Sequence, residues 1–151
     1  MTNTTKGGKV AATSDPVSIG AGRFGFTSGQ VIQEWGFDDD VDHDLRDELA
    51  DSVGVELVDE DYGDVTDSAI VWWRAEDGDS SDLEDLLVDV ASALDDGGLI
   101  WVLVPKIGKP GHFPVLEIGE AARTAGLQPT TSLAAAPDWL GVRLAAPGRG
   151  R

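Results

Sequence analysis

The sequence predicts a small, doubly wound α/β domain, with a mostly parallel sheet that ends in a C-terminal antiparallel hairpin. Short apolar runs of strand length alternate with segments whose apolar residues recur at helical spacing, which is typical of a sheet covered on both faces. The chain has 151 residues, enough for one hydrophobic core. We therefore predict one domain over residues 17–146, with disordered polar tails at 1–16 and 147–151.

The first half of the domain is predicted to begin with a strand at residues 31–35. A helix should follow, because Val41, Leu45, Leu49 and Val53 recur every four residues and Gly54 then provides a C-terminal stop. Residues 38–40 are aspartates and are expected to form the N-cap and first turn. Residues 55–58 are predicted to form a second short strand, and the acidic residues 59–64 a loop.

The second half contains the two most apolar strands. The unbroken runs at residues 69–73 and 99–104 are typical of strands buried on both faces. If residues 69–73 are a strand, Trp72 and Trp73 lie on opposite faces of the sheet. Between the two runs a helix is expected, capped within residues 80–82 and ending at 95–98, with its buried stripe formed by Leu83, Leu86, Leu87, Val90 and Leu94. A loop at 105–114, a helix at 115–125, and strands near 128–135 and 139–145 complete the order.

Charge and composition exclude several classes of function. The chain carries 28 acidic and 11 basic residues, for a formal charge of −17, and it has no cysteine. Such a surface repels nucleic acid and anionic lipid, so we expect neither as a partner. The absence of cysteine excludes thiolate zinc sites, and the chain shows neither an apolar leader nor a membrane span, so we expect a cytoplasmic protein. The acidity itself fits either solubility or a docking face for a basic partner.

One basic island lies at the predicted ligand-binding edge of the sheet. In doubly wound folds ligands bind at the carboxyl ends of the strands. Lys106, Lys109 and His112 lie in the loop after the strand at 99–104, and Arg74 follows the strand at 69–73. These four residues are our candidate patch for a protein partner or a small anionic ligand. The alternative is that the loop only balances the acidic half of the chain.

No metal site and no catalytic residue are predicted. The run from Asp38 to Asp44 contains five aspartates and His43, which suit a divalent ion, but it lacks the glycine and closing glutamate of a calcium loop. We interpret it as a capped, solvated helix start. The chain also has no nucleophile elbow and no phosphate-binding loop, and its two histidines are far apart in sequence.

Two segments follow a known pattern around strands: residues 26–36, FTSGQVIQEWG, and residues 94–102, LDDGGLIWV. They are similar to the approach to the first strand and to a later strand of class I S-adenosylmethionine-dependent methyltransferases, a resemblance that spans residues 26–146. The sequence Ala125-Gly126-Leu127, followed by a hairpin, resembles the family's closing segment. This resemblance implies a Rossmann-like, methyltransferase-like fold.

Three unusual blocks carry a closer resemblance: residues 60–62, Val71-Trp72-Trp73-Arg74 and residues 105–112, PKIGKPGH. They resemble an actinobacterial family of domains of unknown function. This resemblance implies the methyltransferase-like shape and no particular activity.

The chain departs from the methyltransferase pattern at the first strand–helix turn. Methyltransferases keep Gly-x-Gly there, whereas this chain has Gly36 followed by Phe37 and three aspartates. The ring and the carboxylates should crowd and repel the cofactor. If any cofactor site persists, its residues are Gly36, Phe37, and Asp59 or Glu60, the acids placed to hold ribose hydroxyls.

We therefore expect no cofactor and favour a non-catalytic interaction or regulatory domain over an enzyme. The alternative is an atypical S-adenosylmethionine-dependent methyltransferase acting on a small molecule or protein.

Overall fold

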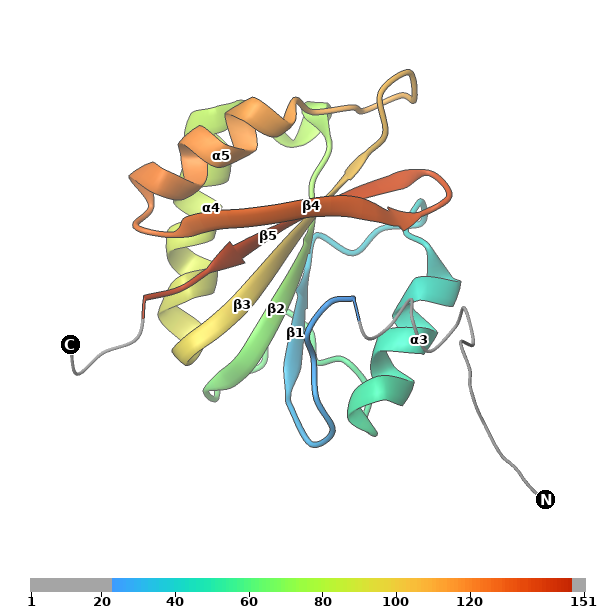
Figure 1. Cartoon of the computed structure of the whole chain (residues 1–151), viewed down its shortest axis with the longest axis vertical. Coiled ribbons are helices and arrows are strands. Elements are labelled where there is room, and N and C mark those ends of the chain that lie inside the picture. The colour runs from blue at the N-terminus through green and yellow to red at the C-terminus, as the bar shows by residue number, and fades with distance from the viewer. Residues whose placement is uncertain (1–22, 148–151) are drawn as a thin grey trace.

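A computed structural model of the chain describes residues 23–147, which form one mixed sheet with helices on both faces (Figure 1). The sheet has five strands in the order β1-β2-β3-β5-β4. Helix α3 covers one face, and helices α4 and α5 cover the other. The predicted tails lie outside the described residues, apart from Pro147. The elements are β1 (Ile32–Trp35), α3 (His43–Val53), β2 (Thr66–Trp72), the short 3-10 helix η1 (Ala75–Asp77), α4 (Ser80–Ala93), β3 (Leu94–Pro105), α5 (Val115–Thr124), β4 (Gln128–Ala136) and β5 (Trp139–Ala145).

The sheet is mixed, which corrects the prediction of a mostly parallel one. Strands β1, β2 and β3 pair in parallel, whereas β5 pairs antiparallel with both β3 and β4. The C-terminal hairpin therefore contributes half of the strand pairings. The predicted strand at 55–58 forms only one parallel bridge, between Val58 and Gln33. Val55 is half-exposed, so little apolar surface holds this segment against the short β1.

Helix α3 begins one turn later than its aspartate run suggested. Its N-cap is Asp42, whose carboxylate accepts the Leu45 N–H at 2.8 Å, and not one of residues 38–40. Its C-terminus was predicted correctly, because Gly54 has φ +89° and donates its N–H to the Ala50 carbonyl.

Helix α4, in contrast, is capped one residue earlier than predicted, by Asp79. Asp79 accepts the Asp82 N–H at 3.1 Å, and Asp82 accepts the Asp79 N–H at 3.0 Å, which forms a reciprocal capping box. The helix ends at Ala93, and residues 94–98 already belong to β3.

The sheet divides the apolar residues into two cores. The α3 side is built on Ile70, Trp72 and Trp101, and the α4–α5 side on Val71 and Trp73. The prediction that Trp72 and Trp73 lie on opposite faces is confirmed. Trp72 and Trp73, at the carboxyl end of β2, each belong to one of these cores, so the turn after this strand lies on buried side chains.

Candidate functional site

The carboxyl ends of the three parallel strands bring most of the predicted site residues to one edge of the sheet. Gly36 directly follows β1, Arg74 follows β2, and Lys106 follows β3. The segment with Asp59 and Glu60 runs beside β1, where Val58 is bridged. The side chains nevertheless form two separate groups, one around Gly36 and one in the loop after β3.

Gly36 occupies a position that no other residue fits. Its φ is +77°, and a Cβ atom added to it would overlap the backbone carbonyl oxygen of Trp72. Its N–H donates to a carboxylate oxygen of Glu60 at 2.8 Å. The acid predicted to face a ribose is therefore already bonded to the turn itself.

Arg74 closes the same turn from inside the protein. Its side chain is only 7% exposed. The guanidinium donates to the Gly36 carbonyl at 2.7 Å and to the Trp72 carbonyl at 3.2 Å, and it lies 5.5 Å from the centre of the Trp139 ring. Both backbone polar groups of Gly36 are thus satisfied within the chain.

Asp40 clamps the outer side of Arg74. One carboxylate oxygen accepts from the guanidinium Nε at 3.0 Å, and the other accepts from its terminal nitrogen. The charges of Asp40 and Asp77 thus surround Arg74. The Arg74 guanidinium is bonded to these groups, whereas Lys109 pairs with Asp138, so Arg74 is not part of the predicted basic patch.

The Asp40–Arg74 pair should make part of the stability depend on pH. The hydrogen bond from Arg74 holds the pKa of Asp40 below its ordinary value of 3.8. A carboxyl with a lowered pKa in the folded state stabilises that state above its unfolded pKa, and this contribution is lost as pH falls through the folded value. We expect Asp40→Asn to reduce the loss of stability below about pH 4. The check is urea denaturation between neutral and acidic pH, with Asp39→Asn as control. If Asp40→Asn loses as much free energy of unfolding at acidic pH as the parent chain, the Asp40–Arg74 pair is not the source of this pH dependence.

Phe37 packs beside an ion pair that the sequence analysis did not identify. Glu34 is buried in β1 and accepts two hydrogen bonds from Arg46 of α3, at 2.7 and 2.9 Å. It also accepts the Trp72 indole N–H at 2.8 Å. The Arg46 guanidinium lies 4.7 Å from the centre of the half-exposed Phe37 ring. The signal in the sequence was the only charged residue of a short strand, with one arginine in the next helix.

The hydrogen bonds to Glu34 raise the pKa of Arg46 above its already high ordinary value, so the Arg46 guanidinium stays charged. A hollow of about 410 Å³ adjoins it on the outside. Asp59 and Glu60 form part of its wall. The carboxylate of Asp59 accepts the Asp61 N–H at 3.0 Å, and its carbonyl accepts from the Gln33 amide at 3.0 Å. The hollow is lined by Glu34, Phe37, Arg46, Leu57, Asp59, Glu60 and Asp61.

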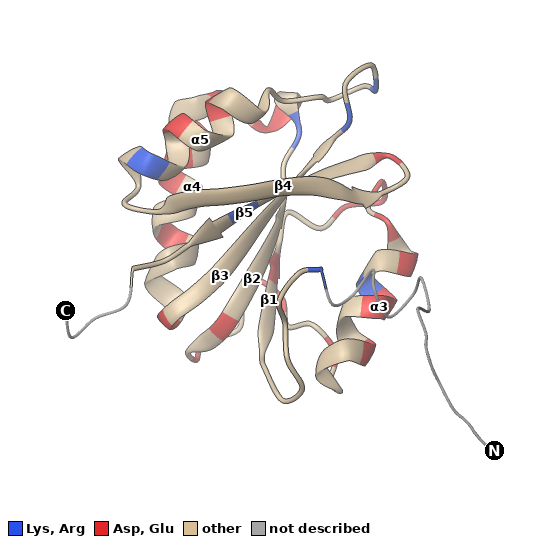
Figure 2. Ribbon diagram, viewed as in Figure 1, with Lys and Arg blue, Asp and Glu red and all other residues tan. Residues whose placement is uncertain are grey.

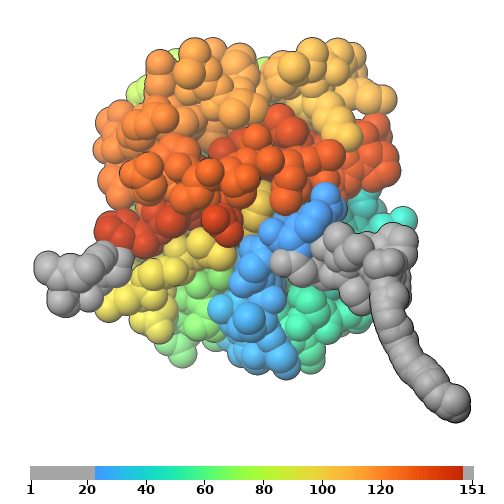
Figure 3. All heavy atoms as spheres, in the orientation of Figure 1, coloured from blue at the N-terminus to red at the C-terminus, as the bar shows by residue number. Residues whose placement is uncertain are grey.

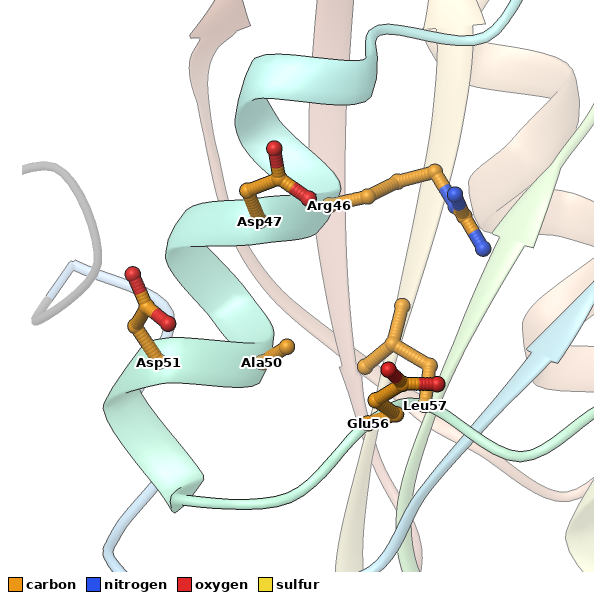
Figure 4. Close-up of a pocket in the computed structure, with 6 residues that line it drawn as sticks. All are labelled: Arg46, Asp47, Ala50, Asp51, Glu56 and Leu57. Carbon is orange, nitrogen blue, oxygen red and sulfur yellow. The ribbon is translucent and has the colours of Figure 1, made fainter.

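A second hollow of about 490 Å³ continues along α3 (Figure 4). Arg46 reaches from the helix across this hollow, and Glu56 and Leu57 form the opposite wall. Asp47 and Asp51 add two carboxylates from the helix. Since the charge of Arg46 is paired with Glu34, this region of the surface is negative.

A third hollow, of about 270 Å³, lies on the other side of Gly36 and reaches the end of β2. Trp73 and Leu86 supply its apolar wall, and Asp38, Glu60 and Asp77 supply carboxylates. The indole Nε1 of Trp73 is buried and has no hydrogen-bond partner in the described part of the chain.

The remaining predicted patch residues lie together in the loop after β3. The Lys109 ammonium is 3.1 Å from the carboxylate of Asp138, which lies in the β4–β5 turn. The Lys106 N–H donates to the Asp138 carbonyl at 3.0 Å. His112 contacts the Pro105 carbonyl through Nδ1 at 2.8 Å, so its ring faces the backbone of its own loop.

Two further observations concern metals and membranes. Across residues 23–147, no three His, Asp or Glu side chains converge in a way that could hold a metal ion. His43 instead lies edge-on to the Phe37 ring, with the ring centres 6.0 Å apart. Among the described helices, none is long and apolar enough to cross a membrane.

Comparison with solved structures defines the class of fold. The chain is similar to the mitomycin 7-O-methyltransferase MmcR, with a TM-score of 0.61 and 13% identity over 86% of this chain, and it spans about half (53%) of that protein. It is also similar to the Burkholderia thailandensis 1,6-didemethyltoxoflavin-N1-methyltransferase, with a TM-score of 0.57 and 16% identity over 87% of this chain and 76% of that one. At this level of identity the likeness shows a methyltransferase-like fold.

Sequence comparison then assigns the family. Residues 21–148 match the family described as protein of unknown function (DUF3052), and the chain belongs to it. Uncharacterized proteins of Mycobacterium tuberculosis and Mycobacterium bovis are each 44% identical to it over 143 residues, covering 95% of this chain and 88% of theirs. The resemblance to a domain of unknown function with a methyltransferase-like fold is thereby confirmed.

Proposed function

We propose that the protein is a non-catalytic, methyltransferase-like interaction domain in which its own side chains occupy the cofactor site. The observation that carries this proposal is the closure of the turn after β1. The Glu60 carboxylate accepts the Gly36 N–H at 2.8 Å, and the Arg74 guanidinium donates to the Gly36 carbonyl at 2.7 Å. Neither backbone group is left for a nucleoside or an amino-acid moiety.

Electrostatics supports the same proposal. S-adenosylmethionine carries a carboxylate, and the hollow beside Gly36 already contains Asp38, Glu60 and Asp77. Arg74 also lines this hollow, but its charge is paired with Asp40. A fourth carboxylate would therefore be repelled without a free cation to compensate it.

The proposal predicts that the cofactor leaves the protein unchanged. Addition of S-adenosylmethionine or S-adenosylhomocysteine should produce no saturable change in tryptophan fluorescence and no rise in the thermal midpoint. The readout is sensitive, because Trp72 and Trp73 line the hollow beside Gly36. A ligand present at 100 times its Kd would add roughly 2.7 kcal/mol of stability, which is about 5–10 °C for a domain of this size.

Saturable stabilisation by either compound would overturn the proposal and favour the alternative, an atypical methyltransferase. Glu60→Gln provides the matched control in that case. It keeps the shape of the wall but removes the acid, so binding through a ribose contact would weaken.

A further inference from the structure

The loop between β3 and α5 carries an exposed tight turn, residues 106–109, which we call the 106–109 turn. The Lys106 carbonyl accepts the Lys109 N–H at 3.0 Å, and Gly108 has φ +88°, as type II turns require at their third residue. Ile107 stands at the corner of the turn and is 83% exposed, more than any other large apolar side chain in the described residues. The turn therefore presents one aliphatic side chain between two lysines.

The structure holds this turn firmly against the body of the domain. The Lys106 N–H is bonded to the Asp138 carbonyl, and the Ala75 N–H to the Gly111 carbonyl, at 3.0 and 2.9 Å. Phe113 is buried, with its ring centre 6.1 Å from that of Trp73. A loop anchored on both sides loses little conformational entropy when a partner binds it.

The charge of this region differs from that of the rest of the protein. Between residues 23 and 147, lysine occurs only at positions 106 and 109, and residues 105–116 contain no acid. Figure 2 shows basic residues on this loop, while α3 and α4 carry mainly acidic ones, and Figure 3 shows the loop protruding at the surface beside the β4–β5 hairpin. The Lys109–Asp138 pair is exposed on both sides, so it contributes little and can be replaced by a pair with a partner's carboxylate.

We propose that the 106–109 turn docks into an apolar hollow rimmed by carboxylates on a partner protein. Ile107 fills the hollow, and Lys106 and Lys109 pair with the rim. An anionic membrane is the less suitable partner, because the acidic residues of 37–96 repel its headgroups and one aliphatic side chain provides little insertion area. This inference rests on the proposed function, because it names the surface and the partner of the interaction domain.

The test is a selection of short random peptides, displayed on phage, against the immobilised full chain. The recovered peptides should place an aliphatic or aromatic residue among Asp and Glu residues. Their affinity should fall roughly 10- to 100-fold for Ile107→Ser, and it should lose most of its salt dependence for Lys106→Gln combined with Lys109→Gln. Val88→Ser is the matched control, because Val88 is an apolar residue 48% exposed on α4 and should leave the affinity unchanged.

The inference is overturned if the selection recovers no peptide above background, if it recovers basic peptides, or if the peptides bind the chain and Ile107→Ser equally. Binding of phosphatidylserine vesicles that depends on Ile107 would also overturn it, in favour of a membrane. The exposed Ile107 makes few contacts, so Ile107→Ser should keep the thermal midpoint of the parent chain. If the protein binds the cofactor and also binds peptides through the turn, only the proposed function is refuted. If it binds neither the cofactor nor peptides through the turn, only this inference is refuted.

Discussion

Replacing Gly36 with alanine is expected to lower the free energy of unfolding by roughly 3 kcal/mol or more, because two costs coincide at this residue. The first is a φ of +77°, which L-residues rarely adopt. The second is the overlap of the new Cβ with the Trp72 carbonyl, a backbone group held in the sheet that cannot rotate away. Urea denaturation followed by tryptophan fluorescence measures the difference.

Gly29→Ala separates these two costs. Gly29 has φ +90°, but an added Cβ would meet nothing within 4 Å. This variant should lose only the conformational term, about 1–2 kcal/mol. If both variants lose the same stability, the close approach of Gly36 to β2 is not a constraint. Should Gly36→Ala fail to accumulate as a folded protein, the soluble yield of the two variants gives the same comparison.

Replacing Arg74 with methionine is expected to cost roughly 2–5 kcal/mol, because each of two buried carbonyls loses its donor at about 1–3 kcal/mol. The acid left behind, Asp40, is half-exposed and can be hydrated, so it adds little to this cost. Methionine keeps much of the volume but leaves the Gly36 and Trp72 carbonyls without the guanidinium donor. The measurement is again the free energy of unfolding in urea.

Arg123→Met is the matched control for Arg74→Met. Arg123 lies in the last turn of α5 and is exposed, so its replacement should cost less than about 1 kcal/mol. Equal effects of the two variants would show that Arg74 does not organise the turn after β1.

Apolar patterning was sufficient to predict most of the fold. The runs containing Ile70 and Trp101 admit few structures other than strands covered on both faces, and both residues are fully buried. The prediction of a strand at 55–58 was wrong. Its residues have a strand-like pattern, but β1 beside it is short, and only one bridge forms between them. The sheet is mixed because β5 of the hairpin lies between β3 and β4 and pairs antiparallel with both. Local sequence does not encode this position in the sheet.

The sequence placed several candidate residues at one edge of the sheet but did not give the direction of their side chains. Gly36 and Glu60 were expected at this edge, and they are hydrogen-bonded there although the segment before Glu60 is not a strand. Arg74 was predicted to be part of an exposed basic patch. Its side chain instead points inward, where the guanidinium donates hydrogen bonds to two backbone carbonyls and to Asp40. The aspartate run offered several possible caps, and in the structure Asp42 caps α3 while Asp40 pairs with Arg74.

The division of the tryptophans by the sheet has a spectroscopic consequence. Trp72, Trp101 and Trp139 belong to the layer under α3, whereas Trp35 and Trp73 pack with the layer under α4 and α5. Intrinsic emission therefore comes from two physically separated populations of indoles, each sensing the melting of its own half. If the tryptophans of one group are replaced with phenylalanine, the remaining emission follows the unfolding of the other layer. Comparing the two sets of variants shows whether the two layers unfold together or one after the other.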